Sequence, residues 1–434
     1  MAHPRTPPPP PTAPHDPPAA RGGRALLLVL AGNMLIDALE VSVVIVALAP
    51  ISTSLGLTPL TTQSMMGGFA LGFAALLLLG APLVTRFGRR PLYLGALTVF
   101  TLASLTGGLT SDPTLLVLTR VLKGLCAALT APTGLAIITT TYPQGPERRR
   151  AISLYSFFGA IGFTTGLLLS GALTSLNWHL AFLATAPAAL LLLCLAARTI
   201  PHDPRHPTGP PPTPTRPAHR LLTNGPLIRS ALGAATLNGT YLSLLVLCAF
   251  YLQTTWHWTP WHTALAFLPA CTPLAAAALF AGPMVARYGA PRLIALGAAT
   301  PLTGYLLALA TAPAHSYATD LLPTMALVGI GFVLSFTALN LHAGSALPPT
   351  DRPAATALYQ TAVQLGAVLL PTATAALLTA GLATHPPGTP GTTDAYRPPL
   401  VLISATAAAG LATALWGLRA SKTTHHKRVD AQTR

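Results

Sequence analysis

The chain has 434 residues, a mean hydropathy of +0.57 and only 8% charged residues, which excludes a soluble globular domain and indicates a polytopic membrane protein. A net charge of +15 would suggest nucleic-acid binding in a soluble protein, but the positions of the cations indicate membrane topology instead. We therefore expect no nucleic-acid partner. The four cysteines lie in apolar runs without CxxC spacing and no HExxH pattern occurs, so neither disulfides, nor a metal site, nor a cofactor is expected.

Residues 1–24 are rich in proline and should form a disordered tail that contains no signal peptide. Twelve apolar runs follow, each long enough to cross a hydrocarbon core of about 30 Å. Six lie in residues 25–198 and six in residues 228–418, separated by a Pro-, His- and Arg-rich linker at 199–227 and followed by a basic tail at 419–434. The runs are 25–51, 62–85, 91–110, 113–139, 151–174, 179–198, 228–253, 261–285, 291–311, 321–343, 354–380 and 399–418.

The first run contains both acids that we place inside the membrane. Asp37 and Glu40 follow Asn33 at i+4 and i+7, so all three side chains lie along one stripe of one helix. An ionised side chain at such depth costs at least about 2.5 kcal/mol unless it is paired or faces a wet cavity. This stripe is therefore a candidate for a substrate or proton path, or for a structural clip, which is the less common alternative.

The fourth run contains two cations that could pair with these acids. Arg120 and Lys123 are three residues apart, so they point from one face of a helix. At about 1.5 Å per residue, Asp37 and Glu40 lie roughly 18 and 22 Å from one membrane surface, and the two cations roughly 10 and 15 Å from the other. All four groups therefore fall at similar depth and are expected to meet. The alternative is that the long Arg120 side chain reaches the membrane surface alone.

The distribution of cations fixes the expected orientation. If both termini are cytoplasmic, 22 of the 25 Lys and Arg residues fall in inner segments, two lie in the fourth run, and Arg397 alone is outside. The predominance of Arg over Lys, with abundant Ala and Pro, is typical of a GC-rich bacterial genome. We expect a multi-pass protein of the bacterial plasma membrane, with both termini and the linker in the cytoplasm.

The two halves of the chain repeat each other. The segment 82–88 recurs at 283–289, and the pattern that begins at Glu147 recurs at Asp351, so the two offsets are nearly equal. An even number of spans in each repeat preserves orientation, which predicts two six-helix bundles related by an axis along the membrane normal. In transporters of this architecture the substrate site lies between the repeats near mid-membrane.

Residues 25–418 resemble the major facilitator superfamily. The loop after the second run matches the signature loop of this family, and Thr85 replaces its usual acid. The resemblance implies that this loop gates the cytoplasmic side. The matching residues are Leu83, Arg86, Gly88, Arg89 and Arg90.

Three further runs resemble motifs of the drug:proton antiporters. Arg120, Gly124, Ala128 and Pro132 match the proton-coupling motif, in which Lys123 replaces the usual Gln. Glu40 stands where a motif of the first run has an acid. The fifth run keeps the antiporter glycines, although ordinary helix packing explains small residues there equally well. These glycines are Gly162, Gly166 and Gly171, and the departures from this motif are Leu167 for Pro and Ser170 for Gly.

Polar residues that share helix faces are weaker candidates for contacts in the substrate cavity. Each is more often an interhelical hydrogen bond than a ligand contact. These residues are Asn33, Asn238, Tyr241, Asn340, Gln360 and Gln364.

The resemblance implies a monomeric secondary transporter, not an enzyme, that is embedded in the lipid bilayer. It exchanges protons for drugs or small apolar or cationic metabolites by alternating access. The alternative is a proton-coupled importer or facilitator of a small metabolite with the same fold. Helix position and the resemblance favour Glu40 as the proton carrier, with Asp37 neutralising Lys123, but the residues alone leave the two roles open.

The expected orientation can be tested by labelling single cysteines in intact cells with a reagent that does not cross the membrane. A cysteine at Thr384 should be labelled, whereas one at Ser421 should be labelled only after the cells are opened. Strong labelling at Ser421 in intact cells would overturn the topology.

Overall fold

The computed structural model describes residues 20–77, 80–200, 221–273, 284–285, 287–344, 347–348, 350–385 and 391–432. Within these ranges it contains helices and no strand, and eleven helices are long and apolar enough to cross a membrane. The predicted all-α membrane fold is therefore confirmed. Of the predicted twelve spans, 261–285 lies partly outside the described residues, as do most of the N-terminal tail and most of the linker.

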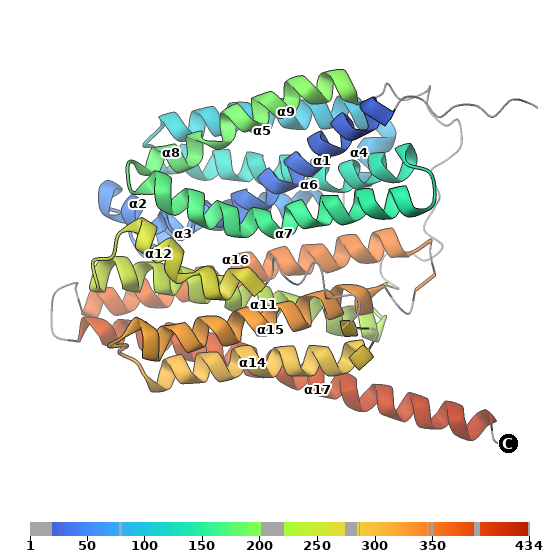
Figure 1. The fold of residues 1–434 in the computed structure, drawn as a ribbon. Coiled ribbons are helices and arrows are strands. Elements are labelled where there is room, and N and C mark those ends of the chain that lie inside the picture. Colours follow the sequence, from blue (N-terminus) through green and yellow to red (C-terminus); the bar gives the residue numbers. More distant parts are fainter. Residues whose placement is uncertain are drawn as a thin grey trace, which may run out of the picture.

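The helices lie side by side in two groups, with the first half of the chain in one group and the second half in the other (Figure 1). The first half comprises α1 (Ala20–Ser42), α2 (Leu48–Leu55), α3 (Pro59–Leu77), α4 (Gly80–Phe87), α5 (Arg89–Leu109), α6 (Pro113–Thr141), α7 (Pro146–Thr174), α8 (Trp178–Leu183) and α9 (Thr185–Thr199). The second half comprises α11 (Gly225–Phe250), η1 (Tyr251–Thr255), α12 (Pro260–Ala266), α14 (Ala290–Ala310), η2 (Tyr317–Leu321), α15 (Leu322–Ala343), α16 (Arg352–Thr384), η3 (Thr392–Tyr396) and α17 (Arg397–Gln432).

The first predicted span, 25–51, is not one continuous helix. Helix α1 ends at Ser42, and the chain turns through residues 43–47 before α2 begins. Residues 43–46 are four consecutive β-branched side chains, which lose rotamer freedom in a helix. The break also leaves backbone carbonyls at the end of α1 without their usual helical donors.

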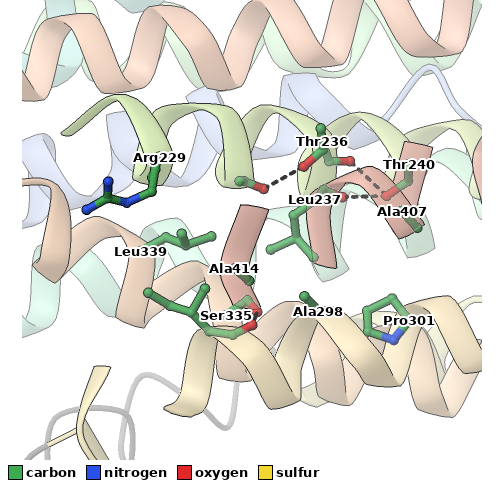
Figure 2. A pocket seen from close by; sticks show the side chains of 13 residues that line it. Arg229, Thr236, Leu237, Thr240, Ala298, Pro301, Ser335, Leu339, Ala407 and Ala414 are labelled. Atoms are coloured by element: carbon green, nitrogen blue, oxygen red, sulfur yellow. Dashed lines mark hydrogen bonds between the residues drawn. The ribbon is translucent and has the colours of Figure 1, made fainter. Parts of the chain in front are cut away.

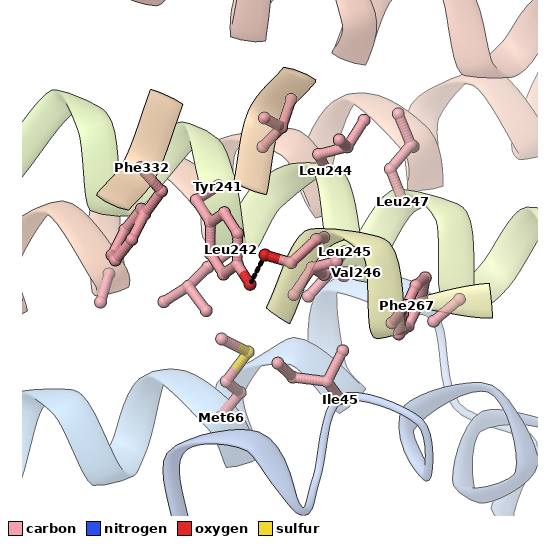
Figure 3. Packing of buried hydrophobic residues seen from close by; sticks show 14 of the residues in the cluster. Ile45, Met66, Tyr241, Leu242, Leu244, Leu245, Val246, Leu247, Phe267 and Phe332 are labelled. Carbon is pink, nitrogen blue, oxygen red and sulfur yellow. Dashed lines mark hydrogen bonds between the residues drawn. The ribbon is translucent and has the colours of Figure 1, made fainter. Parts of the chain in front are cut away.

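The break in α1 packs against the second half of the chain. Val44 and Ile45 are fully buried in the largest apolar cluster. Figure 3 shows Ile45 and Met66 facing apolar side chains of α11, among them Leu245. The burial of these residues at the junction compensates for the helical hydrogen bonds that the break removes.

Two glycines allow the helices around the break to approach closely. An ideal Cβ on Gly166 of α7 would lie 2.7 Å from the Leu39 carbonyl oxygen of α1. A Cβ on Gly124 of α6 would overlap the Phe69 carbonyl of α3. Larger residues at either position would push α1 or α6 away from its neighbour, so these glycines help to place the buried charges described below.

Hydrogen bonds join the halves at the end of the molecule that carries the Trp-rich loop, residues 254–262, which contains Trp256, Trp258 and Trp261. Gln253 donates to the Val46 carbonyl at 3.0 Å, and the Leu60 amide donates to the Thr379 hydroxyl at 3.1 Å. At the same end, Trp261 at the start of α12 donates from its backbone to a serine of the first half. The halves are therefore in direct contact at this end.

The repeated loops lie at the opposite end of the helices. Gly88 and Gly289, the last residues of the repeated segments 82–88 and 283–289, both have positive φ, 83° and 79°. A side chain is strained in this conformation, which explains glycine at both positions. The internal repeat is therefore visible in the backbone as well as in the sequence.

The close approach of α7 to α1 predicts a matched pair of substitutions. Gly166→Ala should lower the midpoint of thermal unfolding in detergent, because overpacking at such a contact costs roughly 1–3 kcal/mol. Gly95→Ala on α5 is the control, since nothing lies within 4 Å of its added Cβ and alanine favours helix. Equal midpoints for the two variants would contradict this account of α7 packing.

Candidate functional site

A buried carboxylate paired with two cations lies at the centre of the first half. Glu40 is fully buried near the end of α1. Its Oε2 forms an ion pair with Arg120 Nη1, and its Oε1 lies 2.7 Å from Lys123 Nζ. The two cations are one turn apart on α6, and both are almost completely buried. Sequence spacing predicted that they point from one face, and the fold brings that face to Glu40.

Arg120 also donates to a backbone carbonyl that the end of α1 leaves without a helical donor. Its Nη2 donates to the Glu40 backbone carbonyl at 2.6 Å, and its Nε donates to the Met65 carbonyl at 3.2 Å. The guanidinium carbon lies 4.9 Å from the centroid of the Phe69 ring. A planar guanidinium can satisfy several acceptors at once. Arg120 therefore links α1, α3 and α6 through both charge and backbone contacts.

Lys123 has partners that the sequence did not reveal. Its ammonium donates to Glu40 and also to the Thr185 hydroxyl at 3.1 Å, and it lies 5.2 Å from the centroid of the Phe100 ring. Thr185 in turn donates to Ser104 at 3.2 Å. These residues come from α5 and α9, at positions where isolated hydroxyls and rings in apolar runs give no recognisable pattern.

Asp37 lies one turn from Glu40 in a different environment. Asn33 donates to its Oδ2 at 2.9 Å and Thr130 donates to the same oxygen at 3.1 Å. Only 6% of Asp37 is exposed, and within the described residues it forms no ion pair. The carboxyl is thus buried among neutral hydrogen-bond donors.

The expectation that Asp37 neutralises Lys123 is wrong, because Lys123 is paired with Glu40. Helices α1 and α6 run in opposite directions. A step from Glu40 to Asp37 along α1 therefore corresponds to a step from Lys123 toward Thr130 along α6. A hydroxyl, and not a cation, consequently faces Asp37.

The arginines of the signature loop contact neighbouring helix ends within the first half. Arg89 Nη1 donates to the Thr140 hydroxyl at 3.1 Å, in the last turn of α6. Arg90 Nη2 donates to the Ala197 carbonyl at 2.7 Å, near the end of α9. Unpaired carbonyls at helix C-termini are favourable sites for cations.

The other loop residues have fewer contacts. Arg86 is exposed, with its guanidinium carbon 5.5 Å from the centroid of the Phe87 ring. Leu83 is half-buried in α4, and Gly88 forms the turn into α5.

Of the antiporter glycines, Gly162 and Gly166 lie against α1, whereas Gly171 lies against α12. Helix α7 is continuous through Leu167 and Ser170.

The polar candidates of the second half are placed differently from those of the first. Asn238 donates to the Val363 carbonyl at 3.2 Å, and the Tyr241 hydroxyl donates to the Ala270 carbonyl at 3.2 Å. Both are interhelical hydrogen bonds. Asn340 is exposed, and Gln360 and Gln364 are half-buried without a hydrogen bond to any described residue.

Aromatic rings lie where the second half meets the first. Tyr241 lies between Phe163 of α7, at 5.9 Å between ring centroids, and Phe332 of α15, at 4.6 Å. Phe332 stacks on Phe336 at 5.0 Å. The described residues contain no group of three metal-ligating side chains. The two halves thus present one charged cluster and one aromatic cluster.

The different surroundings of the two acids predict different effects on stability. Glu40→Gln leaves two buried cations without a carboxylate and should destabilise the protein by about 3–5 kcal/mol. Asp37→Asn keeps an acceptor for Asn33 and Thr130, so the cost should be roughly 1 kcal/mol or less. Thermal unfolding in detergent compares the two, and an equal loss of stability would contradict the assigned contacts.

Comparison with known proteins agrees with this architecture. The chain matches the Major Facilitator Superfamily over residues 30–371. It is 36% identical over 186 residues to the cephamycin export protein of Amycolatopsis lactamdurans, covering 43% of this chain and 38% of that protein. It is 29% identical over 402 residues to the puromycin resistance protein of Streptomyces alboniger, covering 79% of each. The first of these alignments thus spans well under half of the relative's length.

Among solved structures, a bacterial homologue of the human lysosomal transporter Spinster, in an inward-facing and occupied conformation, superposes with a TM-score of 0.76 at 20% identity. The superposition covers 93% of this chain and 98% of that one. The family match spans most of the described helices, from α1 to α16. The chain therefore belongs to the Major Facilitator Superfamily.

Proposed function

We propose that this transporter is a proton-coupled antiporter that exports drugs or small apolar or cationic metabolites by alternating access. The names of its relatives, an antibiotic export protein and an antibiotic resistance protein, support export. The observation that carries proton coupling is the contrast between Glu40, which is held by two cations, and Asp37, which has only neutral partners.

Asp37 is the proton carrier in this proposal. A carboxylate buried without a counter-ion is costly, and a proton removes that cost. Asp37 can therefore be buried when protonated and must be hydrated or paired when ionised. Glu40 is already paired with Arg120 and Lys123, so loss of its charge would leave both cations unpaired. This reverses the roles that the family resemblance favours.

Coupling follows from competition at Asp37. A proton, or a cationic substrate, neutralises the carboxylate and allows the halves to close around it. The acid that has lost its proton requires water, which favours a state open to one side. The aromatic cluster around Tyr241 is suited to an apolar or aromatic substrate, and Tyr and Phe faces also attract cations.

The contacts at the end that carries the Trp-rich loop indicate on which side of the membrane the transporter is closed. If that end is extracellular, as the cation distribution predicts, the hydrogen bonds of Gln253 and Leu60 close the outer side. These contacts must then break when the protein opens outward. The likeness to an inward-facing structure supports the same assignment.

Drug transport into everted vesicles tests the function, with puromycin and a cephamycin as the first substrates. An acidic lumen should drive accumulation by the wild type. Asp37→Asn should abolish accumulation against a gradient, because no proton can be exchanged, but should retain exchange of labelled for unlabelled drug. Asp394→Asn, at an exposed acid in η3, is the control and should transport normally.

Drug-induced proton release from the purified protein provides the second measurement. Release should be lost in Asp37→Asn and retained in Asp394→Asn. Normal proton release from Asp37→Asn would show that the coupling site lies elsewhere. Accumulation that requires no pH gradient would contradict proton-coupled export itself.

A further inference from the structure

A small pocket lies at the start of α11, away from the charged cluster. Its lining includes Arg229, Ser230, Ile294, Leu339 and His342, and its volume is about 30 Å³. A second pocket of about 30 Å³ continues along α11 and shares Arg229, Ile294 and Leu339 with the first. Figure 2 shows Arg229 at one end of this second pocket, beyond Leu339. The cavity is thus polar at one end and mostly apolar along its length.

Arg229 is a half-buried cation, and no carboxylate or hydrogen-bond acceptor among the described residues pairs with it. An ideal Cβ on Gly225 would lie 3.1 Å from its Nη1, and one on Gly417 would lie 3.6 Å from its Nε. The two glycines therefore leave room for the guanidinium between α11 and α17. A guanidinium in such a position is suited to an external oxyanion.

Ser230 provides an independent indication of a ligand. It is 1% exposed, and its hydroxyl has no hydrogen-bond partner among the described residues. Leaving a buried hydroxyl unsatisfied costs about 1–3 kcal/mol. Because Ser230 also lines the pocket, an acceptor placed there would satisfy it. His342 of α15 also lines this pocket.

We propose that Arg229, Ser230 and His342 bind a phosphate oxyanion, supplied by the headgroup of an anionic phospholipid. By this measure a cavity needs about 10–15 Å³ to hold one water-sized group. The pocket, at about 30 Å³, therefore has room for a phosphate oxygen, and the rest of the ligand lies outside it. Neither the direction of transport nor the role of Asp37 enters this proposal.

The surface beside the pocket favours a lipid as the source of the phosphate. Trp416 is 69% exposed, Leu232 is 51% exposed and Leu415 is 43% exposed, on the same two helices that hold Arg229. Exposed apolar side chains on membrane helices contact lipid, and Trp is enriched at the membrane interface. Acyl chains can therefore lie along α11 and α17 while the phosphate reaches Arg229.

The test uses the purified, delipidated full chain. Binding of phosphatidylglycerol, of diacylglycerol with the same chains, and of inorganic phosphate is measured by native mass spectrometry and by thermal stabilisation. Phosphatidylglycerol should bind and stabilise, whereas diacylglycerol should do neither. Arg229→Gln should weaken phosphatidylglycerol binding about tenfold or more, as expected for a charge-assisted hydrogen bond. Arg292→Gln, at an exposed arginine near the start of α14 that does not line the pocket, should leave binding unchanged.

Ser230→Ala keeps the test decisive if Arg229→Gln does not fold. It should weaken phosphatidylglycerol binding by roughly threefold, the effect of one neutral hydrogen bond. Equal losses in Arg229→Gln and Arg292→Gln would indicate diffuse attraction and overturn the site, as would an unchanged affinity in Ser230→Ala. Stabilisation by inorganic phosphate that matches phosphatidylglycerol would support the oxyanion site but overturn the lipid as its source.

Discussion

The contact of Glu40 with Arg120 and Lys123 is the interaction on which the first half depends. Three charged side chains are removed from water together, and each is tolerable only while the others remain. The arrangement needs α1 to end where it does, because Arg120 also binds the Glu40 backbone carbonyl that the break leaves available. It also needs the glycine contact of α6 with α3, which brings Arg120 close to Met65.

Two neighbouring acids on one helix thus have different physical roles. The carboxylate of Glu40 balances cations and fixes the geometry of three helices. Asp37, one turn away, is held by Asn33 and Thr130, which accept either protonation state with little rearrangement. A proton carrier has to change charge without unfolding its surroundings, and the neutral partners of Asp37 meet that condition better than the cations around Glu40.

The two halves have the same fold but differ in the side chains at their functional positions. The first half carries the buried cluster of Glu40, Arg120 and Lys123, whereas the second half presents Tyr241 and Phe332 where the two meet. Arg229 is a half-buried cation of the second half that lies in a pocket within that half and away from this junction. This asymmetry separates the central site that we propose for protons and apolar or cationic substrates from the lateral site that we propose for an anion.

Much of the architecture could be predicted from the order of residues. A long apolar run in a bilayer can satisfy the hydrogen bonds of its own backbone only as a helix. The all-α fold and most helix bounds therefore follow from the positions of the apolar runs. The repeat was visible because Gly88 and Gly289 serve the same turn in each half. The spacing of Arg120 and Lys123 placed both cations on one face, since residues three apart on a helix are neighbours.

Other features were decided by the tertiary structure alone. The sequence could not show whether Lys123 pairs with Glu40 or with Asp37, because the pairing depends on the register between two antiparallel helices. Nor could it identify Thr185 and Ser104 as partners, or Ser230 as an unsatisfied hydroxyl, since single hydroxyls in apolar runs carry no periodic signal. Local periodicity determines which face a residue occupies, whereas helix packing determines what that face meets.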